Sequence, residues 1–128
     1  MNYRFADIFL ILKLHNEARS RGWFSKIKEL ETDDKLTIYA SDWAKYMADS
    51  SKLKHSNMKD IISLGFSNVG ENIAYGQKDE DSVMKTWLWS PGHRRNIMNK
   101  LFTHMGCGLS YSDKNVPYWC VCFGRKKN

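Results

Sequence analysis

The run from Tyr118 to Phe123 constrains the fold most, because it is apolar on both of its alternating faces. Side chains of a strand point alternately to opposite sides, so the run divides into two sets. The two sets are Trp119, Val121 and Phe123 on one face and Tyr118, Cys120 and Cys122 on the other. A strand that is apolar on both faces has to be covered on both faces. The run therefore predicts a sheet with a layer of structure on each side.

The stretch before this run has the alternation of a second strand. One face carries Met105, Cys107, Leu109 and Tyr111, and the other carries His104, Gly106, Gly108 and Ser110. Residues 112–117 are rich in turn-forming side chains and are expected to connect the two strands. A further extended segment is expected from Val69 to Tyr75. The sheet is therefore predicted to be small and mostly antiparallel.

Helical periodicity dominates the first half of the chain. Apolar residues recur at intervals of three and four from Leu36 to Met47, which predicts an amphipathic helix. Asp33 or Asp34 can cap its N-terminus. An earlier helix is expected over residues 5–19, and its apolar face would be formed by Phe5, Ile8, Leu12 and Ala18.

Three further helical segments follow. Residues 58–62 favour one short helical turn within a polar, irregular stretch. The acidic residues 79–81 suit a helix N-terminus, and a helix is expected to run from them through Trp87 until Pro91 breaks it. Residues 93–98 can form another short helix.

Helices in the front and middle with strands at the end predict an α+β fold, a three-layer α-β-α sandwich around a small mostly antiparallel sheet. The chain has 128 residues, of which 42% are hydrophobic and 13% aromatic, and this is ample for one core. The sequence contains neither a linker rich in Pro, Gly or Ser nor an internal repeat. Residues 1–128 are therefore expected to form a single domain.

The net charge of +6 favours anionic partners such as lipid headgroups, acidic glycans or nucleic acid. No ladder of aromatic residues accompanies the basic ones, so nothing predicts nucleic-acid binding specifically. Asp7 interrupts the apolar stretch at residues 5–14 and no small-residue cleavage pattern follows, so no signal peptide is expected in this chain. No apolar run approaches the roughly 20 residues that cross a bilayer. A transmembrane segment is not expected.

Three cysteines lie near the C-terminus, at Cys107, Cys120 and Cys122, and three thiols cannot all pair within one chain. Buried free thiols are the favoured interpretation, and one bridge between the two strands stays open as the alternative. The C-x-C spacing of Cys120 and Cys122 differs from the usual C-x₂₋₄-C spacing, and no second pair is present. A zinc site at these two residues is therefore not predicted.

Two of the four histidines, His55 and His93, stand beside residues that usually break regular structure. A neutral imidazole can bind a divalent metal or transfer a proton near neutral pH. Glu71 supplies a carboxylate that can orient such a pair or balance its charge. These residues can form a His-Glu-His site. Their spacing alone leaves open that each histidine is an ordinary hydrogen-bonded side chain.

Ordered segments of the chain resemble the motifs of the CAP superfamily, which contains cysteine-rich secretory proteins, antigen 5 and pathogenesis-related proteins. These segments are Leu14-His15-Asn16-Glu17-Ala18-Arg19, Lys54-His55-Ser56, Gly70-Glu71-Asn72-Ile73-Ala74, Ser90-Pro91-Gly92-His93-Arg94-Arg95-Asn96-Ile97, Phe102-Thr103-His104-Met105-Gly106-Cys107-Gly108, and Tyr118-Trp119 with Phe123-Gly124. Residues 90–97 resemble the S-P-G-H-R-x-N-I signature of bacterial members, and residues 102–108 resemble their F-T-H-x-G-x-G signature. The resemblance covers nearly the whole chain.

The resemblance implies an α-β-α sandwich with a large open cleft, in which two histidines and acidic residues converge. In some members this cleft binds a divalent cation. His55, Glu71 and His93 match the converging positions and are the candidate catalytic residues. His55 and His93 are the candidate metal ligands, and zinc is the expected cation.

Ser90 and Asn72 are expected to line the same cleft. Many animal and plant members have a second glutamate at the position of Ser90, and bacterial relatives share the serine. A hydroxyl in place of a carboxylate removes a strong metal ligand. Asn72 and Asn96 are expected to bond backbone groups rather than to catalyse. His104 lies outside the matched positions and is expected to be a strand residue.

Three functions are open, because members of the superfamily share the fold but differ in their roles. The favoured function is a secreted, extracellular binding module that engages a lipid, glycan or protein and has little or no enzymatic activity. The first alternative is a metal-assisted, peptidase-like hydrolase in which His55 and His93 hold the cation and Glu71 acts as a base toward water. The second alternative is a structural component of a larger assembly.

Overall fold

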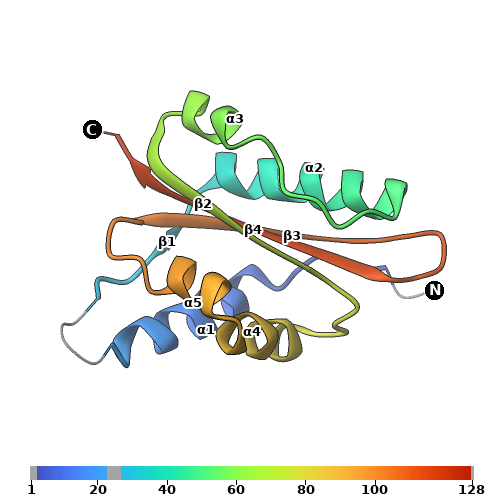
Figure 1. Ribbon diagram of the computed structural model, residues 1–128, viewed down its shortest axis with the longest axis horizontal. Helices are drawn as coiled ribbons and strands as arrows, with labels where there is room; N and C mark the ends of the chain where they lie inside the picture. Colours follow the sequence, from blue (N-terminus) through green and yellow to red (C-terminus); the bar gives the residue numbers. More distant parts are fainter. Residues whose placement is uncertain (1–2, 23–26, 128) are drawn as a thin grey trace.

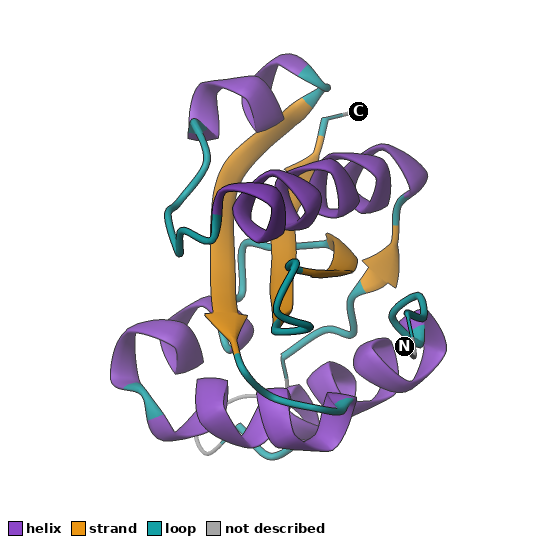
Figure 2. Ribbon diagram, turned by 90° about the vertical axis from the view of Figure 1, so that its right-hand side faces the viewer, coloured by secondary structure: helices purple, strands orange, loops and turns teal. Residues whose placement is uncertain are grey.

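The computed structural model describes residues 3–22 and 27–127. Its elements are α1 (Ile8–Ser20), β1 (Glu31–Thr32), α2 (Asp34–Ser50), α3 (Met58–Ser63), β2 (Phe66–Tyr75), α4 (Glu80–Trp89), α5 (Pro91–Ile97), β3 (His104–Tyr111) and β4 (Pro117–Lys126). Figure 1 shows α2 and α3 on one side of the sheet and α1, α4 and α5 on the other. Figure 2 shows the same strands between helical layers from a second direction. The predicted three-layer α+β arrangement is confirmed.

The strand order of the sheet is β1-β3-β4-β2. β4 pairs antiparallel with β3 and with β2, whereas β1 runs parallel to β3. The prediction of a mostly antiparallel sheet is confirmed, and β2 forms an outer edge. The sequence pattern did not indicate β1, because its two residues are exposed and carry no apolar alternation. None of the described helices combines the length and apolar character needed to span a membrane.

Each face of the sheet has its own apolar core. The core under α1, α4 and α5 takes Trp119, Val121 and Phe123 from β4. The core under α2 and α3 takes Tyr118, Cys120 and Cys122 from the same strand. The two-sided burial predicted from the pattern of β4 is confirmed. Complete burial of each large apolar side chain contributes roughly 1.5–3 kcal/mol relative to its exposure.

The three thiols are free and buried, so the favoured interpretation of the cysteines is confirmed. Cys107 belongs to the core under α1, α4 and α5, and Cys120 and Cys122 belong to the other core. The sheet separates Cys107 from the other two. The alternative of a bridge between the two strands is therefore wrong.

α2 lies directly against β3 at two glycines. A Cβ added at Gly106 would lie 2.1 Å from the backbone nitrogen of Thr37, and one at Gly108 would lie 2.4 Å from Cα of Ser41. Atoms this close overlap strongly, so any side chain at these positions would force the helix away from the strand. Glycine therefore sets how closely the α2 layer approaches the sheet.

Replacing Gly108 with alanine is expected to lower the free energy of unfolding by roughly 2–3 kcal/mol. The added methyl would meet backbone atoms of Ser41 and Ala40, which cannot move without displacing α2. Urea denaturation of this variant measures the loss. Gly92→Ala is the matched control, because the nearest atom to its added Cβ is the end of the Arg95 side chain at 3.8 Å. Equal losses in both variants would contradict the close packing of α2 on β3.

α1 begins later than the sequence pattern predicted. Its first residue is Ile8, and the side chain of Asp7 caps it by accepting a hydrogen bond from the backbone nitrogen of Leu10. Phe5 precedes the helix and is 93% exposed, so the prediction that it contributes to the buried face is wrong. The cap accounts for the difference, because Asp at this position favours a helix start. The buried residues of α1 are Ile11, His15 and Arg19.

His15 is a neutral core residue. Burial lowers its pKa to about 4, outweighing the hydrogen bond between Nδ1 and the carbonyl of Ile11. The imidazole packs against Phe123, with 5.6 Å between the ring centroids. At neutral pH the ring therefore adds no charge to the core.

Arg19 is completely buried and binds backbone carbonyl oxygens. Its guanidinium donates to the carbonyls of Lys28 at 2.7 and 2.9 Å, Ile97 at 2.9 Å, Asn99 at 2.9 Å and Phe102 at 3.2 Å. Burial lowers its pKa to about 10, so the side chain stays charged at neutral pH. One side chain thus joins α1 to the segments that precede β1 and β3.

Candidate functional site

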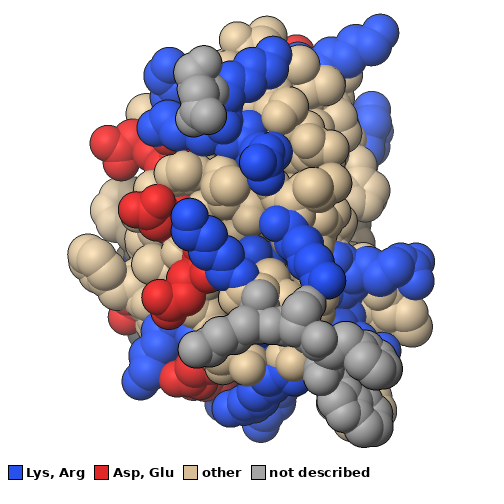
Figure 3. Space-filling view, turned by 90° about the vertical axis from the view of Figure 1, so that its left-hand side faces the viewer, with Lys and Arg blue, Asp and Glu red and all other residues tan. Residues whose placement is uncertain are grey.

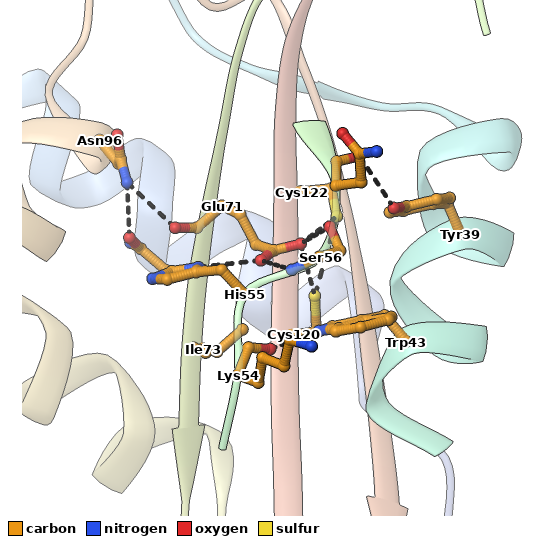
Figure 4. A network of polar contacts seen from close by, with 12 residues as sticks. Tyr39, Trp43, Lys54, His55, Ser56, Glu71, Ile73, Asn96, Cys120 and Cys122 are labelled. Carbon is orange, nitrogen blue, oxygen red and sulfur yellow. Dashed lines mark hydrogen bonds and ion pairs between the residues drawn. The ribbon is translucent and has the colours of Figure 1, made fainter. Parts of the chain in front are cut away.

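Glu71 is the centre of a buried polar network on β2. Its side chain is fully buried, and its Cα lies opposite that of Cys122 on β4. Oε1 accepts hydrogen bonds from Nδ1 of His55 and the backbone nitrogen of Ser56, both at 2.9 Å. Oε2 accepts one from the hydroxyl of Ser56 at 2.5 Å. Figure 4 shows these groups converging on the carboxylate.

The segment that carries His55 and Ser56 lies between α2 and α3, and α2 holds it in place. Nε1 of Trp43 donates to the carbonyl of Lys54 at 2.7 Å. The hydroxyl of Tyr39 donates to the carbonyl of Asn57 at 3.3 Å. Two side chains of α2 therefore fix the backbone on both sides of the two residues that contact Glu71.

His55 presents one nitrogen to the protein and keeps the other available. Because Nδ1 faces a carboxylate, it carries the hydrogen and donates it to Glu71. Nε2 then has a free lone pair, and the side chain is 58% exposed. A carboxylate that fixes the tautomer of an imidazole in this way is typical of histidines that bind metals.

Two asparagines tie α5 to the outer edge of β2. Nδ2 of Asn72 donates to the carbonyl of His93 at 3.0 Å. Nδ2 of Asn96 donates to the side-chain oxygen of Asn72 at 2.8 Å and to the carbonyl of Glu71 at 3.2 Å. Asn72 and Asn96 therefore bond backbone groups, as predicted. Asn72 itself is fully buried.

His93 is half-buried, and its Nδ1 has no hydrogen-bond partner among the described residues. Desolvation lowers its pKa, and the nearby charge of His55 lowers it further. The two imidazoles are therefore close enough to influence each other electrostatically. His55 contacts β2 through its side chain, which is bonded to Glu71, whereas His93 is bonded to β2 through its backbone carbonyl, which accepts from Asn72.

Ser90 lies at the junction of α4 and α5. It is partly buried, and its side chain makes no capping hydrogen bond to α5. Its carbonyl accepts from the backbone nitrogen of Arg94 at 2.8 Å, which fixes the first turn that carries His93. His104 is the first residue of β3, as predicted, and its Nε2 lies 3.7 Å from a carboxylate oxygen of Glu31.

Two thiols adjoin the same carboxylate. The Sγ atoms of Cys120 and Cys122 each lie 3.8 Å from Oε2 of Glu71 and 3.7 Å from each other. Within residues 3–22 and 27–127, these three side chains form the one group of potential metal ligands whose donor atoms all lie within 4.8 Å. His55 and His93 do not belong to it. The C-x-C pattern did place both thiols on one face, but Glu71 comes from a distant strand.

Comparison with known proteins gives a consistent match. The model of the cysteine-rich secretory protein family, CAP, matches residues 12–123. The uncharacterized protein YkwD of Bacillus subtilis is 33% identical over 106 residues, which cover 77% of this chain but only 40% of YkwD.

Two solved structures superpose closely on this chain. An outer surface protein of Borrelia burgdorferi has a TM-score of 0.81 at 23% identity. The match covers 93% of this chain and 92% of that protein. An extracellular protein of Bacillus anthracis that contains an SCP domain has a TM-score of 0.79 at 29% identity. The match covers 93% of this chain and 40% of that protein.

Proposed function

The chain belongs to the cysteine-rich secretory protein family, CAP, and from this premise we propose that it is a binding module whose His55 and His93 hold a divalent cation. Zinc is the expected cation, because neutral imidazoles are among its preferred ligands. The proposed place of action is outside the cell. The extracellular and outer-surface proteins among its structural neighbours support this location.

The hydrogen bond between His55 and Glu71 carries the proposal. It fixes one nitrogen of His55 and leaves the other free to bind a cation. His93 adds a second imidazole whose pKa is lowered, so at neutral pH it has the uncharged form that binds metals. With Ser90 in place of a second carboxylate, water would complete the coordination, and the expected affinity is modest.

The geometry favours binding over hydrolysis. A general base has to reach the water from which it takes a proton. Both oxygens of Glu71 already accept hydrogen bonds from His55 and Ser56, and the side chain is fully buried. Glu71 therefore suits the positioning of His55 better than the activation of a metal-bound water. A peptide library incubated with the protein and zinc is expected to remain uncleaved.

The charge of the surface favours an anionic ligand. Figure 3 shows Lys and Arg side chains gathered over one face of the molecule, with Asp and Glu toward one side of it. A hollow beside His104 is bordered by three lysines, Lys28, Lys126 and Lys127, and by two glutamates, Glu29 and Glu31, so its basic residues exceed its acidic ones by one. Acidic glycans and anionic lipid headgroups are the ligand classes that such a face attracts. Glycan and lipid arrays distinguish these classes. An absence of binding on both arrays would indicate that the ligand is a protein.

Alanine at His55 or His93 is expected to weaken zinc binding by more than about tenfold, because each substitution removes one imidazole ligand. Isothermal calorimetry measures the dissociation constant, and proton NMR of the imidazole signals identifies the rings that respond. His104→Ala is the control, since this histidine contacts Glu31 on β1. Zinc affinity that stays the same in both His55→Ala and His93→Ala would refute the proposed cation site.

A further inference from the structure

We propose that Glu71, Cys120 and Cys122 form a second metal site, buried between β2, β4 and α2, that binds zinc or a similar thiol-preferring divalent cation. This site is separate from the one at His55 and His93. It uses Oε2 of Glu71, whereas Oε1 of the same carboxylate holds His55.

The spacing of the three donor atoms fits a zinc ion. Zinc bonds to sulfur at about 2.3 Å and to carboxylate oxygen at about 2.0 Å, so tetrahedral angles place two sulfurs about 3.8 Å apart and sulfur and oxygen about 3.5 Å apart. The observed separations are 3.7 Å between the sulfurs and 3.8 Å from each sulfur to Oε2. A shift of the carboxylate by roughly 0.3 Å would complete the match.

The backbone holds these donors in a fixed arrangement. Cys120 and Cys122 are two residues apart on β4, so their side chains share one face. Glu71 lies directly opposite Cys122 in the β2–β4 register, with its side chain on the same face. Sites on paired strands are more rigid than sites on loops, and rigid placement favours metal binding.

The charge of the site also favours a cation. Buried carboxylates are normally paired with a charge or bound to a metal. Among the described residues, Glu71 forms its ion pair with His55, and His55 is charged only when it is protonated. A divalent cation would bind the carboxylate and two thiolates after both thiols release their protons, which leaves a net charge of −1 that a protonated His55 beside Oε1 would balance. The hydroxyl of Ser56 donates to Oε2 and so holds the carboxylate in place.

The competing explanation is that the thiols are simple weak donors to Glu71. Burial raises the pKa of Cys120 well above its usual range, so without a metal this thiol stays as S–H. Separations of 3.8 Å are compatible with weak S–H···O contacts. This explanation predicts no metal uptake by the cysteines, which makes the two alternatives experimentally distinct.

Cobalt(II) tests the proposal, because thiolate ligands give it a near-ultraviolet charge-transfer band that imidazole ligands do not. The protein is refolded under reducing conditions with Co²⁺, freed of excess metal and compared with its variants. We expect one ion at the thiol site, with its band, in the wild type, in Cys107→Ser and in the His55→Ala/His93→Ala double variant. We expect no band in Cys120→Ser/Cys122→Ser. The histidine variant separates this site from the proposed surface site.

Cys107→Ser is the matched control, because Cys107 is equally buried but lies on the opposite face of the sheet. A folded wild-type protein without the band, or a band that persists in Cys120→Ser/Cys122→Ser, would overturn the proposal. If that double variant does not fold by circular dichroism, X-ray absorption on the zinc-loaded wild type decides. Two sulfur neighbours at about 2.3 Å are expected, and a shell of nitrogen and oxygen alone would refute the site.

Discussion

Replacing Arg19 with methionine is expected to lower the free energy of unfolding by about 5 kcal/mol, which is comparable with the whole stability of many domains. Methionine fills much of the space of the arginine stem but donates no hydrogen bond. The carbonyls of Lys28, Ile97, Asn99 and Phe102 would lose their shared donor. Each buried carbonyl without a partner costs about 1–3 kcal/mol, and Asn99 and Lys28 can recover part of this through water.

Urea denaturation followed by circular dichroism measures this loss. Arg21→Met, at an exposed position two residues away, is the control and is expected to change stability by less than about 0.5 kcal/mol. Arg19→Lys should fall between wild type and Arg19→Met, because lysine keeps the charge but lacks the planar fork. Nearly equal stability of Arg19→Met and Arg21→Met would show that the carbonyl cluster does not depend on Arg19.

The layers of the fold were predictable because apolar periodicity reports which faces are covered. Both faces of β4 are buried, and α2 has the buried positions that its three- and four-residue spacing indicates. Asp33 and Asp79 cap α2 and α4 where acidic residues precede each helical pattern. Local patterns of this kind act within a few residues, so a single sequence is enough to detect them.

Features that depend on distant partners were not predictable in the same way. β1 has two exposed residues, and it exists because it pairs with the start of β3. Arg19 has the composition of a surface residue, yet four carbonyls from other segments make its burial possible. Periodicity also assigned Phe5 to α1, whereas the cap at Asp7 starts the helix later.

The candidate site shows the same difference between local patterns, which the sequence reveals, and contacts between distant segments, which it does not. Bare spacing left His55, Glu71 and His93 as separate residues, and only the family resemblance brought them together. The hydrogen bond between His55 and Glu71 agrees with that expectation, whereas His93 is linked to Asn72 through its backbone carbonyl and has a pKa lowered by desolvation and by His55. The contact of Glu71 with two thiols arises from the β2–β4 register, which no local pattern encodes.

Replacing Glu71 with alanine is expected to lower the free energy of unfolding by about 4 kcal/mol. The backbone nitrogen and hydroxyl of Ser56 would lose their acceptor inside the protein, and a cavity would replace the carboxylate. His55 would lose the contact that fixes its tautomer, so zinc affinity at the imidazoles should fall by roughly 10- to 100-fold. Both results follow from one carboxylate that supports the loop and orients the histidine.

Glu71→Gln separates these two roles, because glutamine keeps the shape and one acceptor oxygen but carries no charge. It should recover about half of the lost stability while zinc binding stays weak. Asp49→Ala is the control for removing a carboxylate, since Asp49 forms an exposed ion pair with Lys45. Loss of an exposed pair of this kind is expected to lower the free energy of unfolding by less than about 1 kcal/mol. Urea denaturation and calorimetry on the same preparations measure both quantities. Wild-type zinc affinity at the imidazoles of a folded Glu71→Gln protein would show that the charge of Glu71 does not prepare His55 for the cation.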